Sequence, residues 1–133
     1  MKYFGKMEMA KPKQIFLKSN NKITENYFKF LDQHVADVVL GKCDDFMEIN
    51  LIAKKLLISH QYLTETVQKE TGNHPCYFYD LKIIDKAKNM LSTTQLPIAE
   101  IARLLTYDPS NFSKFFKKFV GQTPLKYREQ HTR

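Results

Sequence analysis

Apolar residues recur at helical spacing in short segments along most of the chain, and the clearest segment lies near the carboxyl end. There, four aromatic residues at i, i+3, i+4 and i+7 share one helical face: Phe112, Phe115, Phe116 and Phe119. Polar and cationic residues occupy the other face. The pattern predicts a helix of about twelve residues that Asp108 caps, Pro109 begins and Gly121 ends, with the aromatic face in the core.

A second, shorter apolar period immediately precedes this helix. Ile101, Ala102 and Leu105 fall at helical spacing, and the run Thr106-Tyr107 interrupts that spacing before the capping residue. Together the two segments indicate a helix-turn-helix whose second helix is basic. At 1.5 Å per residue the second helix would be roughly 18 Å long, which fits the major groove of DNA.

The same unit occurs earlier in the chain. A shift of 49 positions aligns Ile49, Ile52, Ala53, Leu56, Lys69, Gly72 and Pro75 with Ile98, Ile101, Ala102, Leu105, Lys118, Gly121 and Pro124. Leu63 and Val67 stand where Phe112 and Phe116 stand, so the buried face repeats as well. Two copies are too few for a solenoid. We therefore expect two helix-turn-helix subdomains joined by one helix.

The remaining apolar periods complete an all-α prediction of about seven helices. The other expected helices are Thr24 to about Leu40, Phe46–Leu57 after Asp44 and Asp45, His60–Glu70 after Ser59, Pro75–Leu91, one from Pro97 and a short one from Pro124. The expected divisions are a basic amino-terminal tail (1–22), a first subdomain (23–74), a linker helix (75–91) and a second subdomain (92–133).

Charge is distributed unevenly along the chain. The formal net charge of +7 and the pI near 9.4 favour an acidic partner. Residues 1–22 carry +5, residues 23–81 carry −4 and residues 82–133 carry +6. The second subdomain should therefore supply most of the attraction to phosphates. The tail is either a mobile basic segment or an arm that touches DNA or docks on the core.

The composition argues against a membrane protein and against an enzyme. No segment approaches the roughly 18 consecutive apolar residues of a membrane span. Cys43 and Cys76 are isolated thiols, and the four histidines are too dispersed for a metal site, so we expect a reduced, cytoplasmic protein without metal or cofactor. A glycine-rich phosphate loop and zinc-ligand spacing are absent from the sequence, which disfavours an enzyme.

A long, ordered series of residues resembles a known family. The series comprises Ala87-Lys88 and Leu91, then Ile98-Ala99-Glu100-Ile101-Ala102, Asp108–Lys118 and Gly121–Arg128. Over about residues 24–130 the chain resembles the DNA-binding domain of the AraC/XylS family of bacterial transcription regulators. The resemblance implies an all-helical fold with two recognition helices in successive major grooves of double-stranded DNA.

The resemblance also bears on partners. Family members usually join this domain to a ligand-sensing domain, whereas this chain is similar in scope to the small stand-alone activators, so no small-molecule effector is implied. RNA polymerase is a further candidate partner, and no membrane partner is expected. Three places depart from the family pattern: Thr106-Tyr107 replaces a longer Gly-Phe turn, Ile83 replaces a frequent Arg, and Val67-Gln68-Lys69 replaces Phe-Lys-Lys.

Candidate DNA-binding residues of the second subdomain lie on the polar face of its second helix. They are the cations Lys114, Lys117 and Lys118 and the short polar residues Ser110, Asn111 and Ser113. The cations could neutralise phosphates or form a solvated basic face. The short polar groups could reach base edges and phosphates, or could cap the helix and face water. Arg128 could hold a phosphate or close the last helix.

The candidates of the first subdomain are His60, Gln61, Thr64, Glu65 and Lys69. Gln61 could bond adenine through two hydrogen bonds, and the Thr64 methyl could meet a thymine methyl. Glu65 could accept from cytosine N4, but a carboxylate also repels phosphates. Lys69 is the counterpart of Lys118, and His60 begins the helix.

Two functions remain open from the sequence. One is a sequence-specific DNA-binding regulator that uses both recognition helices. The other is a protein-interaction module or anti-activator on the same fold, in which only the second subdomain binds DNA because the acidic first subdomain has lost that contact.

Overall fold

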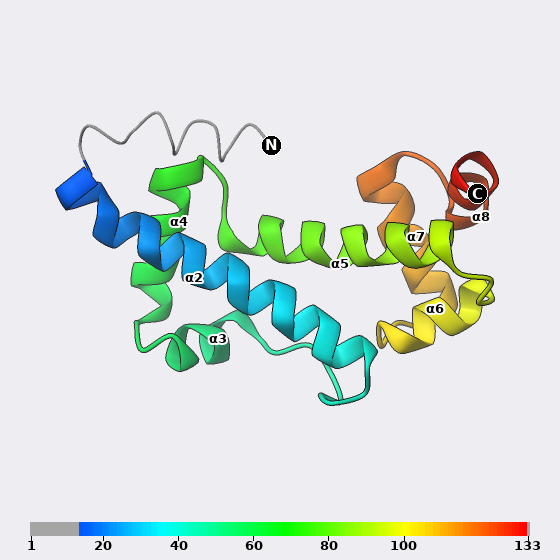
Figure 1. Cartoon of the computed structure of the whole chain (residues 1–133), viewed down its shortest axis with the longest axis horizontal. Coiled ribbons are helices and arrows are strands. Elements are labelled where there is room, and N and C mark those ends of the chain that lie inside the picture. The colour runs from blue at the N-terminus through cyan, green and yellow to red at the C-terminus, as the bar shows by residue number, and fades with distance from the viewer. Residues whose placement is uncertain (1–13, 133) are drawn as a thin grey trace. The chain divides into compact units, whose positions relative to one another are not determined.

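The computed structural model describes the backbone of residues 14–132 and the side chains of residues 22–132. The described residues form seven helices: α2 (Gln14–Val39), α3 (Ile49–Lys55), α4 (His60–Thr71), α5 (Pro75–Thr93), α6 (Ile98–Leu104), α7 (Pro109–Val120) and α8 (Pro124–His131) (Figure 1). The all-α prediction is confirmed. Most of the predicted basic tail, residues 1–13, lies outside the described residues.

The described chain packs into two compact units. The amino-terminal unit contains the described residues up to Leu31 together with Met47–Tyr79. The carboxyl-terminal unit contains Asp32–Phe46 and the chain from Asp80 onward. Helices α2 and α5 therefore each contribute residues to both units. The predicted divisions follow the sequence motifs, whereas these two units follow the packing.

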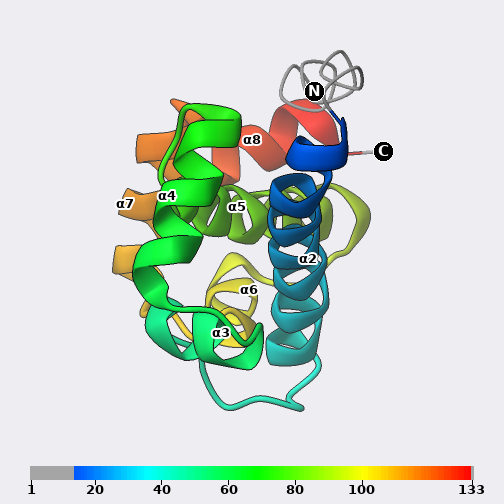
Figure 2. The same ribbon diagram turned by 90° about the vertical axis from the view of Figure 1, so that its left-hand side faces the viewer.

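The sequence repeat is preserved residue for residue in the helices. Each bound of α6 and α7 is the corresponding bound of α3 and α4 plus 49, and α8 begins at the counterpart of the first residue of α5. Helix α3 packs against α4 and is joined to it by a turn (Figure 2), as α6 is to α7. The two helix-turn-helix motifs are therefore built on one template.

The turn between the paired helices has the same unusual backbone in both copies. Leu57 and its counterpart Thr106 adopt left-handed φ angles of 65° and 62°. In each copy the next residue donates back into the preceding helix: Ile58 N to Ala53 O at 3.1 Å, and Tyr107 N to Ala102 O at 2.8 Å. A side chain is disfavoured at such a φ, where glycine fits best. Thr106, although it is not glycine, therefore adopts the same left-handed turn as Leu57 in the first copy.

Aliphatic and aromatic side chains close the core of the amino-terminal unit. Tyr27, Leu31, Ile52, Leu63 and Val67 are fully buried. The Tyr27 hydroxyl donates to the carbonyl oxygen of Pro75 at 2.8 Å, so this buried polar atom has a partner. The core thus ties α2 to the beginning of α5.

The core of the carboxyl-terminal unit is built around α7. Phe112 and Phe116 are fully buried, and the Phe116 ring meets Tyr127 of α8 edge to face at 5.6 Å. Phe115 and Phe119 were also predicted to be core, but both are only partly buried. A short helix can turn only part of its circumference inward, and these two rings lie at the edge of the stripe, where they pack on each other at 5.2 Å.

Two predicted helix starts are wrong. Helix α2 begins at Gln14, well before Thr24, and α3 begins at Ile49 rather than Phe46. Asp45 does not cap α3, because its Oδ1 accepts instead from Phe46 N at 2.7 Å and from the Thr106 hydroxyl at 3.0 Å. The chain before α3 is therefore held by a contact with the distant second turn.

Candidate nucleic-acid interface

Helix α4 has well-defined ends and one buried face. The Ser59 hydroxyl accepts from Tyr62 N at 3.0 Å, and Gly72 ends the helix at a φ of 84°. Both signals match the prediction. Leu63 and Val67 are fully buried, which turns the opposite side of the helix to solvent.

The solvent side of α4 carries the predicted residues of the first motif. His60, Gln61, Glu65 and Lys69 are exposed, and Thr64 is partly buried. The Gln61 amide Nε2 donates to Glu65 Oε2 at 3.0 Å, one helical turn away. The sequence placed both residues on one face but did not predict that they bind each other.

Asp108 organises the beginning of α7. Its Oδ2 accepts from Ser110 N at 3.1 Å, from Asn111 N at 3.4 Å and from the Ser110 hydroxyl at 2.7 Å. The pKa of the Asp108 carboxyl is lowered, and the hydrogen bond from the Ser110 hydroxyl contributes most to this shift. Ser110 therefore takes part in capping, which was one of its two predicted roles.

The solvent side of α7 is cationic. Asn111, Lys114, Lys117 and Lys118 are exposed, and Ser113 is partly buried. Helix α7 has three lysines and no acidic residue, whereas α4 has one lysine and two glutamates. Helix α7 is therefore strongly cationic, whereas α4 carries more acidic than basic residues.

Asp80 of α5 lies near this cationic face, a neighbour that was not predicted from the sequence. Burial raises the pKa of the Asp80 carboxyl, and the positive charge of Lys118 opposes that rise. Tyr107, in the turn before α7, stacks on Phe115 at 5.1 Å, and burial raises the pKa of its hydroxyl, with Asp80 adding to the rise. A long-range electrostatic neighbour of this kind leaves no local trace in the sequence.

Arg128 of α8 binds the end of α5. Its Nε donates to the carbonyl oxygen of Leu91 at 2.9 Å, and its Nη2 donates to that of Thr94 at 3.3 Å. The last carbonyl groups of a helix lack partners within the helix, and a cation there also suits the helix dipole. Arg128 therefore joins α8 to the end of α5, a role that differs from the two that the sequence predicted, a phosphate contact or closure of the last helix.

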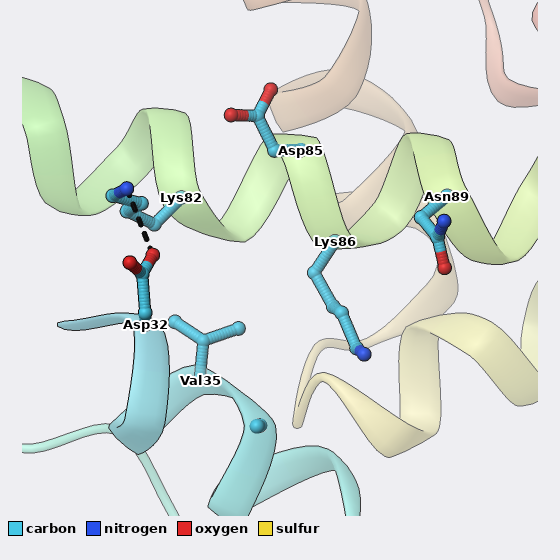
Figure 3. A pocket seen from close by; sticks show the side chains of 7 residues that line it. Asp32, Val35, Lys82, Asp85, Lys86 and Asn89 are labelled. Atoms are coloured by element: carbon cyan, nitrogen blue, oxygen red, sulfur yellow. Dashed lines mark ion pairs between the residues drawn. The ribbon is translucent and has the colours of Figure 1, made fainter. Parts of the chain in front are cut away.

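A separate groove of about 370 Å³ lies in the carboxyl-terminal unit between α2 and α5. Lys82 and Asp32 point toward each other across it, with Lys82 Nζ 2.8 Å from Asp32 Oδ1, while Asp85 points away from that pair (Figure 3). Lys86 and Asn89 complete its polar lining. Because charges of both signs line this groove, it does not extend the cationic face of α7.

Among the described side chains, those of residues 22–132, no group of three His, Cys, Asp or Glu could bind a metal ion. Over the same residues, every helix is too short or too polar to cross a membrane.

The repeated helix-turn-helix is matched by a known family. A family model for the helix-turn-helix domain, of the AraC/XylS type, covers residues 52–130. The chain belongs to the AraC/XylS family. Domains of this family are DNA-binding domains of transcription regulators, not enzymes.

Curated relatives of this AraC/XylS-family chain come from several bacteria. The Msm operon regulatory protein of Streptococcus mutans is 30% identical over 116 residues, which are 86% of this chain and 40% of that protein. The regulatory protein SoxS of Escherichia coli is 27% identical over 113 residues, 84% of this chain and 98% of that protein. The chain therefore spans less than half of the longer operon regulator and nearly all of the shorter protein.

Solved structures share the fold. The C-terminal domain of AraT, a response regulator from Geobacillus stearothermophilus, matches with a TM-score of 0.71 and 27% identity, over 84% of this chain and 87% of that one. The DNA-binding domain of AdpA, solved with a target DNA, matches with a TM-score of 0.59 over 73% of this chain and 91% of that one. At 21% identity, the second likeness concerns the fold alone.

Proposed function

We propose that this chain is a sequence-specific regulator of transcription whose α4 and α7 enter successive major grooves of double-stranded DNA. The observation that carries the proposal is the exact repetition of the helix-turn-helix, with each second helix exposing a polar face opposite a buried one. A recognition helix in such a motif contacts base edges with its amino-terminal residues. Gln61 and Thr64 in α4, and Asn111 and Ser113 in α7, hold those positions.

Phosphate contacts fall mainly to the second motif. Lys114 and Lys117 are exposed on α7, and no acidic residue of that helix offsets them. Lys118, Lys69 and Arg128 are proposed as further phosphate contacts. A guanidinium has five N–H donors, so Arg128 keeps donors beyond the two that bind Leu91 and Thr94. His60 and Ser110 lie at the first turns of their helices and are proposed to face the DNA backbone.

The proposal extends to the setting of the protein. We place it in the cytoplasm of a bacterium, with duplex DNA as its partner and RNA polymerase as a candidate second partner. Neither a small-molecule effector nor a cofactor is needed for the proposed activity.

A fluorescence titration of labelled duplexes with the full chain, at two salt concentrations, tests the proposal. Counterion release by the α7 lysines should weaken binding steeply as salt rises. A matched variant, with Lys114 and Lys117 replaced by Ala, should show a shallower dependence. Absence of salt-dependent binding by the unsubstituted chain would refute DNA binding.

The alternative function keeps DNA contact in the second motif only. The specific observation in its favour is that α4 exposes Glu65, where α7 exposes its counterpart Lys114. Replacing Gln61 and Thr64 together by Ala separates the two functions. If α4 reads bases, the double variant loses sequence preference while keeping its salt-dependent affinity. An unchanged preference would favour the alternative.

A further inference from the structure

A hydrogen bond joins two exposed side chains of α4: the Gln61 amide Nε2 donates to Glu65 Oε2 at 3.0 Å. Both residues belong to the solvent side of the helix. A carboxylate on a surface meant for phosphates should weaken binding, because like charges repel. The Glu65 carboxylate on this surface is explained if it has a role whose benefit to binding is larger than this repulsion.

The chemistry of a primary amide indicates that task. Gln61 has one carbonyl oxygen and two N–H donors, and Glu65 occupies one of these donors. The oxygen and the second N–H remain free. These are the two groups that bond adenine in the major groove, with the oxygen accepting from N6 and the N–H donating to N7.

Glu65 also disfavours the opposite orientation of the amide. If the Gln61 side chain were reversed, its carbonyl oxygen would face the carboxylate, and two acceptors would repel each other. A glutamine without such a neighbour can turn either way and loses rotamer freedom on binding. A held amide has already lost part of that freedom, so it discriminates better between bases.

Helix α7 has no counterpart of this pair. The residues that correspond to Gln61 and Glu65 under the 49-residue shift are Ser110 and Lys114. The Ser110 hydroxyl binds Asp108 instead, at 2.7 Å. Of the two motifs, the first alone therefore has an amide held by a carboxylate.

We propose that Glu65 is a positioning residue that orients the Gln61 amide for adenine in the half-site read by α4. This inference rests on the proposed function and deepens it. It assigns the carboxylate a role through Gln61 rather than a direct contact with cytosine, and it accepts weaker overall binding in exchange for sharper base discrimination.

The test compares base preference across variants of the full chain. The preferred duplex is first found by selection from a random pool, and each position of it is then varied. Gln61→Ala should abolish the preference for adenine at one position, which identifies the base read by Gln61. Glu65→Ala should lower the preference at that same position by about tenfold, while raising affinity for all duplexes.

Two further variants separate positioning from charge. Glu65→Gln keeps an acceptor oxygen without the charge, so it should keep the adenine preference and still raise general affinity. Glu25→Ala removes an equal charge from an exposed position of α2 and should leave the preference unchanged. Circular dichroism establishes that each variant is folded.

The outcomes distinguish this inference from the function on which it rests. Full adenine preference in Glu65→Ala would overturn the positioning role, and so would a loss of preference at a different, cytosine-containing position. A pool from which the unsubstituted chain selects no motif would instead overturn the proposed function.

Discussion

At the scale of single residues, two turn positions carry a side chain where the backbone conformation favours glycine. Leu57 and Thr106 adopt left-handed φ angles, although each carries a side chain. Such a conformation costs a non-glycine residue about 1–2 kcal/mol. The turn persists because the buried residues on both sides of it, such as Ala53 and Leu63, fix the paths of the two helices.

Replacement of Leu57 by Gly should stabilise the protein. The Leu57 side chain is 90% exposed and contributes little to the core. Relief of the strained φ should raise the free energy of unfolding by about 0.5–1 kcal/mol after the entropy cost of glycine. Thr106→Gly is the matched comparison and should gain less, because it also loses the hydroxyl bond to Asp45. Urea denaturation measures both, and an equal or larger gain for Thr106→Gly would contradict the importance of that bond.

His34 should make stability depend on pH. His34 is only 3% exposed, and its burial lowers the pKa of the imidazole. The negative charge of Asp37 opposes part of this fall. A lowered pKa in the folded state means that the unfolded chain binds the proton more readily. Stability should thus be fully present above the ordinary pKa of 6.5 and decrease as pH falls below it.

Urea denaturation at pH 7.5 and 5.5 checks the His34 prediction, with His34→Gln as the comparison. The unsubstituted protein should lose more stability on acidification than the variant. Equal losses would show that other groups control the acid sensitivity.

At the scale of helices, local signals were enough to predict α4 and α7, whereas contacts between residues distant in sequence were not predicted. Ser59 and Gly72 mark the two ends of α4, as predicted. Such ends can be predicted because a capping side chain and a left-handed glycine act within one helical turn. The start of α3 was missed because Asp45 binds Thr106, a residue distant in sequence. The electrostatic influence of Lys118 on Asp80 was missed for the same reason.

The three lysines of α7 should contribute unequally to DNA binding. Lys114→Ala and Lys117→Ala should each lower the salt dependence of the binding constant by about one unit of slope. Lys118→Ala should lower it by less, since the charge of Lys118 already interacts with Asp80. Lys29→Ala, at an exposed position of α2, is the matched control and should leave the slope unchanged. Titrations at several salt concentrations give the slopes, and an equal effect of all four substitutions would contradict a specific role for α7.

Arg128 should stabilise the junction of α8 with α5. Arg128→Ala removes donors from the carbonyl oxygens of Leu91 and Thr94, which are partly shielded from water. Hydrogen bonds from a charged donor contribute about 1.5 kcal/mol or more, so the free energy of unfolding should fall by about that amount. Arg128→Lys cannot reproduce the paired geometry and should recover only part of it. An unchanged stability in Arg128→Ala would show that these two bonds contribute nothing.

At the scale of the whole molecule, the repeat and the distribution of charge carry different parts of the account. The repeat could be predicted from the sequence because both copies keep the same spacing. The bounds of the helices follow that spacing residue for residue. The two packing units could not be predicted from the sequence motifs, because α2 and α5 each contribute residues to both units. In the proposed function, the basic second motif supplies attraction to DNA through α7, and the acidic first motif supplies base discrimination through α4.

Selection of binding sites from a random duplex pool by the full chain tests the central claim most directly. If α4 and α7 both read DNA, the recovered motif should contain two half-sites about ten base pairs apart, the spacing of one helical turn. A pool without an enriched motif, or a motif with a single half-site, would contradict the claim.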